Sequence, residues 1–302
     1  MAGQTASKSA AVLHSEAKIR IRPLGGFIGA EIEGVDLRKP LSSEQFKAVH
    51  DAFVNFEVIV LRDQDITVDQ QMAFGALVGE LSIHPVSPNL ADKPEVIILD
   101  YSKDNPPALT DIWHVDETFR EAPPMATILR AKVVPEAGGD TLFASMSAAY
   151  RGLSERMKQH IHGLESLHDF KPWRPLFSHA DRAKLRQLED EFPNPWHPVV
   201  RVHPVTGRRV LYVVNRQFCV RIKDLKLDES DALLEFLYRQ ATIPEVQLRV
   251  KWQPNTLVMW DNRSVQHYAS HDYYPARRTM ERVTVKGDKP KGVTRSMVRR
   301  AG

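Results

Sequence analysis

The chain has 302 residues, of which 42% are hydrophobic and 26% charged, and its formal net charge is +3. These values are ordinary for a soluble globular protein that folds as one large domain or two. The only concentrated basic run is the tail from Lys286 to Arg300, no basic patch is interleaved with aromatic residues, and no apolar stretch could span a bilayer, so we expect neither a nucleic-acid nor a membrane partner.

Strands and helices alternate in the first third of the chain. We expect residues 1–17 to be disordered, because they are mostly small and polar. Alternating and short apolar runs predict strands over residues 18–22, 27–35, 57–62 and 95–101. Capping-box patterns predict helices over residues 42–53 and 67–77.

The remainder of the chain is richer in strands. Apolar runs predict strands over residues 126–134, 142–143, 199–202, 209–214, 246–252, 256–260 and 280–285. Helices are predicted over residues 146–152, 154–164 and 228–242. Many strands that enclose a ligand cavity favour a mostly β fold with packed helices and a double-stranded β-helix core, that is, a cupin-like jelly roll.

Three segments complete the predicted domain organisation. Residues 18–290 form a single domain, and residues 291–302 form a basic tail. Within the domain, residues 172–196 carry several prolines and many charges, which is typical of a lid or a disordered insertion. Cys219 is the only cysteine, so no intrachain disulfide is possible, and residues 1–17 lack the apolar run of a secretory signal. We therefore predict a cytoplasmic protein.

Three residues have the chemistry of one metal site: His114, Asp116 and, far downstream, His267. Two imidazoles and one carboxylate can occupy one face of an octahedral Fe(II) and leave the opposite positions open. His114 and Asp116 are two positions apart, so on a strand their side chains would share a face. The tripeptide by itself is weak, because such triplets are frequent by chance and most histidines are structural. Taken alone, it favours a surface histidine and a loop carboxylate.

Two arginines follow the second histidine. If the strand of His267 turns and the next strand returns beside it, Arg278 lies near the metal. Arginine suits a bound carboxylate because its planar fork forms two parallel hydrogen bonds. Arg282, four positions later, would share a strand face with Arg278, so one cavity could hold two anionic groups. A cationic surface strand explains the same residues equally well.

Several motifs, taken together and in order, carry a family resemblance. They are His114–Asp116, Gly138–Thr141, Trp260–Arg263, Gln266–Ala269, Pro275–Arg282, Gly25–Leu37 and Gly287–Pro290. This set closely resembles the taurine dioxygenase family of Fe(II)- and 2-oxoglutarate-dependent dioxygenases, over roughly residues 18–290.

The resemblance implies a complete metal and cosubstrate site. His114, Asp116 and His267 would bind Fe(II). Arg278 would hold the distal carboxylate of 2-oxoglutarate, and Thr141 would bond a carboxylate of the same molecule. O2 would be the second cosubstrate.

The resemblance also implies substrate contacts. Arg282 would bind the anionic head of the substrate, His84 would contact it, and Phe218 would form an aromatic wall. Trp260 would lie near the iron, although core packing explains it better. A homodimer or homotetramer follows from the resemblance alone.

Three residues depart from the taurine enzyme, namely Ser87, Thr110 and Glu117, which stand in place of a tyrosine, an asparagine and a valine. Smaller side chains at 87 and 110 would widen the pocket, and an acid at 117 could repel a second anion or recognise an amine. We therefore expect hydroxylation of a sulfonate, an alkyl sulfate or an aryloxyalkanoate, often with C–S or C–O cleavage, yielding succinate and CO2.

Other functions remain open. The same iron site could act on a different small acid, or the fold could serve as a non-catalytic binding protein, a nucleic-acid demethylase or a non-oxygenase metal enzyme such as a lyase or isomerase. The last class would need neither 2-oxoglutarate nor O2. A related halogenase lacks the metal-binding carboxylate, whereas Asp116 supplies it here.

Overall fold

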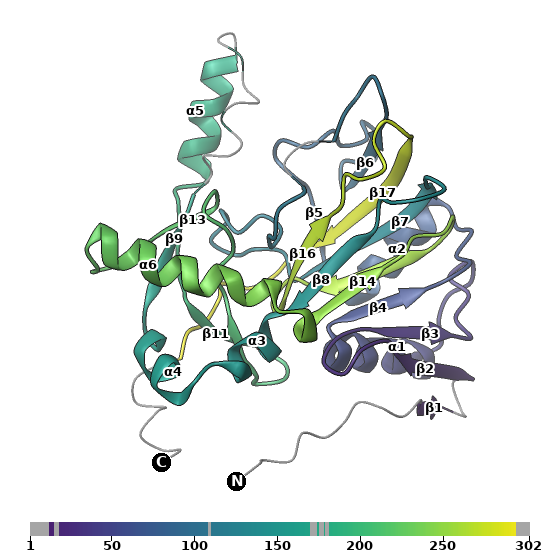
Figure 1. Cartoon of the computed structure of the whole chain (residues 1–302). Helices are drawn as coiled ribbons and strands as arrows, with labels where there is room; N and C mark the ends of the chain where they lie inside the picture. The colour runs from purple at the N-terminus through teal and green to yellow at the C-terminus, as the bar shows by residue number, and fades with distance from the viewer. Residues whose placement is uncertain are drawn as a thin grey trace.

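The computed structural model describes residues 12–14, 18–107, 110–169, 174, 178 and 181–293. These residues form a mostly β protein with packed helices (Figure 1). Within them, no helix combines the length and the apolar character needed to cross a membrane.

The largest sheet forms one wall of the molecule. Its strands follow the order β1 (Val12–His14), β2 (Ile19–Pro23), β3 (Ala30–Glu33), β4 (Val58–Leu61), β15 (Leu257–Asp261), β7 (Ala126–Val133), β17 (Arg278–Val285) and β5 (Leu81–Ser82), and β6 (Val96–Tyr101) also pairs with β17. The β3–β4 pair is parallel and the other pairs are antiparallel. The central strands are apolar along their length because both faces of the sheet are covered.

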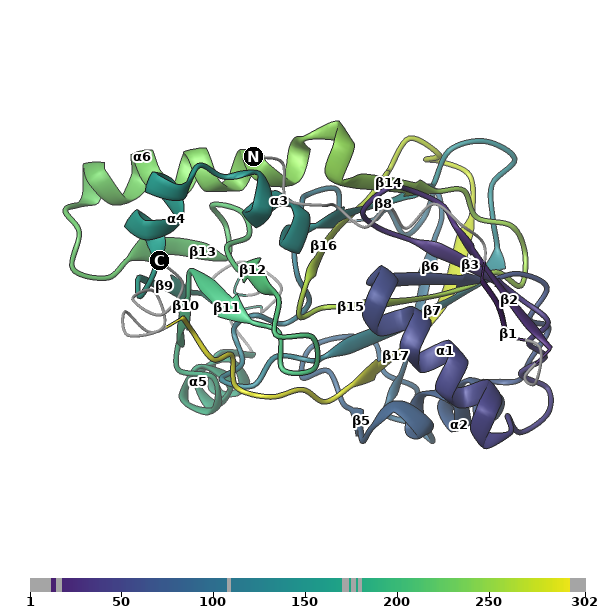
Figure 2. The same ribbon diagram turned by 90° about the horizontal axis from the view of Figure 1, so that it is seen from below.

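Two helices cover one face of this sheet, as Figure 2 shows: α1 (Ser43–Phe56) and α2 (Val68–Val78). Each begins at a capping box, centred on Ser42 and Thr67, as predicted. The buried face of α1 follows the helical period, and its apolar side chains form one core with the sheet.

A second, smaller sheet covers the opposite face. It has the order β14 (Gln247–Val250), β8 (Thr141–Ser145) and β16 (Val265–Ala269). Apolar side chains from both sheets meet between them, among them Phe143 of β8 and Trp260 of β15, whose ring centroids lie 5.4 Å apart. The edge of this small sheet at β16 is where the predicted metal ligands lie.

The remaining elements build a third region beside the two sheets. It contains α3 (Met146–Gly152), α4 (Glu155–Ile161), α5 (Arg182–Glu191), α6 (Leu227–Tyr238), the short helices η3 (Arg239–Thr242) and η4 (Pro244–Val246), and strands β9 (Glu165–His168), β10 (Trp196–Pro198), β11 (Val200–Val202), β12 (Arg209–Leu211) and β13 (Cys219–Ile222). Figure 1 shows α5 projecting from this region beside β9 and β13.

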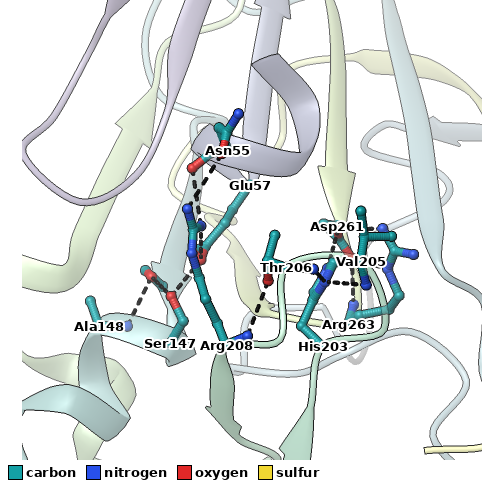
Figure 3. Close-up of polar contacts among 11 residues, drawn as sticks. Asn55, Glu57, Ser147, Ala148, His203, Val205, Thr206, Arg208, Asp261 and Arg263 are labelled. Carbon is teal, nitrogen blue, oxygen red and sulfur yellow. Dashed lines mark hydrogen bonds and ion pairs between the residues drawn. The ribbon is translucent and has the colours of Figure 1, made fainter. Parts of the chain in front are cut away.

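Buried polar contacts join the β11–β12 hairpin to the large sheet (Figure 3). Asp261, fully buried at the end of β15, accepts two hydrogen bonds from the Arg263 guanidinium and one from His203 Nε2 at 2.9 Å. Nδ1 of His203 accepts backbone N–H groups of Val205 and Thr206, which places the ring hydrogen on Nε2. His203 therefore holds the hairpin to the large sheet by a hydrogen bond to Asp261, whose charge Arg263 compensates.

A second contact uses the other end of the hairpin loop (Figure 3). Arg208 donates to the carbonyl oxygen of Asn55 at 3.2 Å, and its Nη1 lies 3.8 Å from Oε1 of Glu57. The same carboxylate accepts from the Ser147 hydroxyl at 2.5 Å, so Glu57 links α1, α3 and the hairpin.

The structure differs from the predicted boundaries at both ends of the domain. Residues 12–14 form β1, within the segment expected to be disordered, and the rest of residues 1–17 lies outside the described residues. In the predicted basic tail, Gly292 bridges Arg201 and Val293 is buried, while residues 294–302 lie outside the described part. Of the predicted lid at 172–196, the described portion includes α5 and the first residue of β10, and part of the segment is not described.

Candidate metal centre and the adjoining cavity

The three predicted metal ligands meet in space. One ligand atom from each of His114, Asp116 and His267 lies within 4.8 Å of the others. The backbones of His114 and His267 form an antiparallel bridge at the free edge of β16. Asp116 lies in a turn rather than on a strand, so the predicted shared strand face is wrong, and the turn brings its carboxylate to the imidazoles instead.

Both imidazoles are neutral, and a hydrogen bond fixes the tautomer of His114. Nδ1 of His114 donates to the carbonyl oxygen of Ile112 at 2.7 Å, which leaves Nε2 with its lone pair. Burial lowers the pKa of His114 and of His267, so both rings are neutral at physiological pH. Nε2 of His267 lies 3.7 Å from Oδ1 of Asp116.

Asp116 is an ionised buried carboxylate. Burial alone would raise its pKa, but the charge of Arg282, the two imidazoles and a hydrogen bond from Thr127 together hold the pKa below its usual range. Two neutral nitrogen donors and one buried anion on one side of a site suit a divalent first-row cation. The donor set therefore fits Fe(II).

A chain of hydrogen bonds orients this carboxylate. Nε1 of Trp260 donates to Oδ1 of Asn262 at 2.9 Å, and Nδ2 of Asn262 donates to Oγ1 of Thr127 at 2.9 Å. The Thr127 hydroxyl then donates to Oδ2 of Asp116 at 2.5 Å. An indole N–H can only donate, so the direction of the whole chain is fixed. Trp260, for which we expected core packing, also lies against His267, with ring centroids 4.7 Å apart.

The predicted cosubstrate residues stand on the two facing sheets, Arg278 on β17 and Thr141 on β8. The Arg278 guanidinium is buried between the rings of Trp252 and Tyr273, at 5.7 and 5.8 Å from their centroids. Nε1 of Trp252 donates to Oγ1 of Thr141 at 3.0 Å, which connects the two predicted residues. Among the described residues, Nε and Nη2 of Arg278 have no hydrogen-bond partner. A buried cation with free donors fits a carboxylate ligand.

Gly139 supports this arginine. Its φ of +70° lies in the left-handed region, and a Cβ there would lie 3.3 Å from Cδ of Arg278 and 3.2 Å from the ring of Tyr273. The Gly138–Gly139 turn therefore lets the backbone pack directly against the predicted cosubstrate site.

A cavity of about 280 Å³ adjoins the metal ligands. All six predicted substrate residues line it, namely His84, Ser87, Thr110, Glu117, Phe218 and Arg282. His114 and Asp116 line it as well, so the cavity opens onto the metal site. The rest of the wall is largely apolar and includes Val86, Pro88, Ile98, Leu99, Val115 and Phe119.

His84 presents a fixed donor to this cavity. Its Nδ1 accepts the backbone N–H groups of Val86 and Ser87 at 3.2 and 3.0 Å, so the ring hydrogen is on Nε2. Burial lowers its pKa to about 4. His84 therefore serves as a neutral hydrogen-bond donor at physiological pH.

Sequence reasoning missed several residues of the site. Trp252 and Tyr273 enclose Arg278, Thr127 and Asn262 orient Asp116, and Arg120 bonds Glu117 at 2.7 Å. Asn262 stands in a recognised motif, but the others belong to no motif, and their roles depend on contacts between distant segments.

The comparisons with known proteins agree with this geometry. A family model described as taurine catabolism dioxygenase TauD, TfdA family matches residues 20–284. An alpha-ketoglutarate-dependent sulfate ester dioxygenase of Pseudomonas putida is 36% identical over 282 residues, covering 91% of this chain and 92% of its own. An alkylsulfatase of Acinetobacter baylyi is 34% identical over 278 residues, covering 90% and 86%.

A solved structure is similar as well. The crystal structure of a taurine dioxygenase from Burkholderia xenovorans matches with a TM-score of 0.79 and 35% sequence identity, covering 91% of each chain.

Proposed function

This chain belongs to the taurine catabolism dioxygenase family (TauD, TfdA), and from that membership we propose that it hydroxylates a small anionic organic substrate. Like its relatives, it is a 2-oxoglutarate-dependent dioxygenase, an oxidoreductase that uses Fe(II), 2-oxoglutarate and O2. When bound, the iron couples oxidative decarboxylation of 2-oxoglutarate, which releases succinate and CO2, to hydroxylation of a substrate C–H bond.

The protein supplies positions and charges for this chemistry. In our proposal, His114, Asp116 and His267 hold the iron, while Arg278 and Thr141 hold 2-oxoglutarate. The free donors of the buried Arg278 support that role, because a carboxylate would complete their hydrogen bonds.

We assign substrate binding to the cavity. Arg282 and the Nε2–H of His84 would hold the anionic head, and the apolar wall, with Phe218, would hold the carbon chain. Ser87 and Thr110 leave room for a longer chain than a bulkier pair would. Sulfonates, alkyl sulfates and aryloxyalkanoates all combine such a head and chain, and hydroxylation beside the heteroatom would cleave the C–S or C–O bond.

One observation supports this function most directly: the His–Asp–His cluster adjoins a cavity that is also lined by Arg282, and the buried Arg278 stands on the same strand as Arg282. The first test is anaerobic titration of the apoprotein with Fe(II) and 2-oxoglutarate. We expect the visible charge-transfer band of a chelated 2-oxo acid. The band should weaken in Arg278→Ala and vanish in His267→Ala. A folded, metal-loaded protein without the band would contradict the assignment of 2-oxoglutarate.

A second test identifies the substrate. Succinate release would be screened with matched alkyl sulfates, alkyl sulfonates and aryloxyalkanoates. Release with a different small acid alone would support the same iron site acting on another substrate. A protein that binds these anions without releasing succinate would be a binding protein.

The core topology, the cellular location, the oligomeric state and the lid are also part of the proposal. The two facing sheets support a jelly-roll core within a single domain at residues 18–290. Cys219 as the only cysteine supports a reducing, cytoplasmic location. A homodimer or homotetramer, and a lid role for residues 172–196, stay part of the proposal. Size-exclusion chromatography with light scattering tests the oligomer, and substrate-dependent proteolysis tests the lid.

A further inference from the structure

Four charged side chains meet at the end of the cavity next to the metal ligands. Nη2 of Arg282 lies 3.1 Å from Oδ1 of Asp116 and 3.7 Å from Oε1 of Glu117. On its other side, Glu117 accepts a hydrogen bond from Nε of Arg120 at 2.7 Å. Glu117 is thus placed between two arginines.

Glu117 is an unusual residue for this position. Its side chain is only 1% exposed, although it lines the cavity. Its backbone has φ of +49°, a left-handed conformation that non-glycine residues seldom adopt. Oε1 accepts no hydrogen bond from any described residue. A buried carboxylate in a strained turn does not favour stability, so a functional explanation is called for.

Arg120 holds Glu117 in this place. Its guanidinium also donates to the carbonyl oxygen of Ile83 at 2.8 Å and lies over the ring of Phe192, 4.9 Å from the centroid. These contacts fix Arg120 beside the cavity, where it compensates the charge of Glu117. Arg282 is therefore left with its charge available to a ligand.

The charges on the side chains at this end of the cavity leave one net positive charge, that of Arg282. In the proposed complex, Fe(II) and Arg278 together balance Asp116 and the two carboxylates of 2-oxoglutarate, and Arg120 balances Glu117. Arg282 leaves one positive charge, which matches one negative charge on a substrate head. A second negative charge would face the Glu117 carboxylate at short range in a site of low dielectric constant, where like charges repel strongly.

We propose that Glu117, positioned by Arg120, is a specificity-determining residue that admits singly charged head groups and rejects doubly charged ones. This deepens the proposed function and rests on its anionic substrate at Arg282. Sulfate esters, sulfonates and carboxylates carry one charge at neutral pH. A phosphate monoester has a similar shape but carries about −1.5 to −2.

The test compares an alkyl sulfate with the alkyl phosphate of the same chain length. Binding is measured anaerobically at pH 8 by calorimetry, with protein loaded with Fe(II) and 2-oxoglutarate. The wild type should prefer the sulfate, and Glu117→Gln should reduce that preference by about tenfold or more, mainly by binding the phosphate more tightly. Glutamine keeps the size of the side chain and removes the charge.

Glu121→Gln is the matched control. Glu121 is exposed, pairs with Lys289 on the surface and stands close to Glu117 in the chain. Its variant should retain the wild-type preference. An unchanged sulfate-to-phosphate ratio in Glu117→Gln would overturn the proposal.

Arg120→Met tests the positioning role. Without Arg120, Glu117 should pair with Arg282 and weaken alkyl sulfate binding by about tenfold, whereas the double variant Arg120→Met/Glu117→Gln should regain it. Weak binding that the double variant does not regain would contradict the role of Arg120. If the wild type binds no sulfate, or if Arg282→Met binds it equally well, the proposed function itself fails at the anion site.

Discussion

The hydroxyl of Thr127 donates to Oδ2 of Asp116 across 2.5 Å, and this contact leaves Oδ1 as the oxygen nearest to His267 and Arg282. Since Asn262 donates to the same hydroxyl oxygen, the hydroxyl hydrogen of Thr127 points to Asp116. The carboxylate is therefore oriented in the absence of a metal, and Oδ1 is the oxygen that would face a metal held by the two imidazoles.

Thr127→Val should weaken metal binding. Valine keeps the shape of threonine but removes the hydroxyl, and loss of such an outer hydrogen bond commonly reduces metal affinity by about 10–100-fold. Co(II) titration in competition with a chelator measures this affinity without turnover. Thr127→Ser restores the hydroxyl and should recover most of the affinity. Equal affinity of Thr127→Val and the wild type would show that the contact does not position Asp116.

Gly139→Ala should weaken 2-oxoglutarate binding. The new Cβ would crowd Arg278 and Tyr273, and the left-handed backbone adds a cost of about 1–2 kcal/mol for an L-residue. The dissociation constant of 2-oxoglutarate and the free energy of unfolding should both change in the unfavourable direction. Gly152→Ala, at the last residue of α3, is the control: its Cβ meets no atom within 4 Å, so it should leave both cosubstrate binding and the free energy of unfolding close to the wild-type values.

Asp261→Asn should destabilise the fold. The change leaves Arg263 buried without its anion, and breaking such a buried pair costs about 3–5 kcal/mol. Chemical denaturation measures the free energy of unfolding. The exposed pair of Arg216 and Glu235 provides a comparison, because Arg216→Met should cause no measurable loss. Similar losses in the two variants would mean that the hairpin does not depend on the buried pair.

His197 should make stability fall in acid. Burial lowers its pKa from 6.5 to about 4, while its Nε2–H bonds the carbonyl oxygens of Thr118 and Arg120. Below pH 6.5, His197 is protonated in the unfolded chain but stays neutral in the folded protein. Stability that is present at higher pH is therefore lost as the pH falls toward 4. Between pH 7.5 and 5 this one residue should account for about 2 kcal/mol.

The variant His197→Gln checks this expectation because glutamine keeps a donor but cannot titrate. Its free energy of unfolding should decline less steeply between pH 7.5 and 5 than that of the wild type. Parallel pH curves for the two proteins would assign the loss to other groups.

Local pattern was enough to predict much of the fold. The capping boxes at Ser42 and Thr67 and the apolar run of β4 depend only on neighbours in the chain. Helix α5 is mostly polar and buries only Leu188, so hydrophobic periodicity gave no signal for it. Strand β13 has only four residues, which is too short for its apolar side chains to form a clear pattern.

The site residues that lie in local sequence motifs were predicted as well, and those that depend on distant contacts were not. His114, Asp116 and His267 stand in motifs, and the structure brings them together. The turn at Asp116 was not predicted. Its left-handed residue is Glu117, whereas a glycine is the residue that would have indicated such a turn in the sequence. Thr127 could not be recognised either, since its role depends on a contact with Asp116 across two segments.

Arg278 and Arg282 stand on the same strand, β17, which is paired along its length with β6 and β7. Four residues of extended chain span about 13 Å, so their Cα atoms keep a fixed separation whatever the cavity contains. In the proposed complex, the sheet would therefore set the spacing between the cosubstrate and the substrate anion. If both arginines bind anions as proposed, a longer or shorter substrate would have to be accommodated by the apolar wall at Val86, Pro88 and Leu99, because the backbone positions of the two arginines are fixed by the sheet.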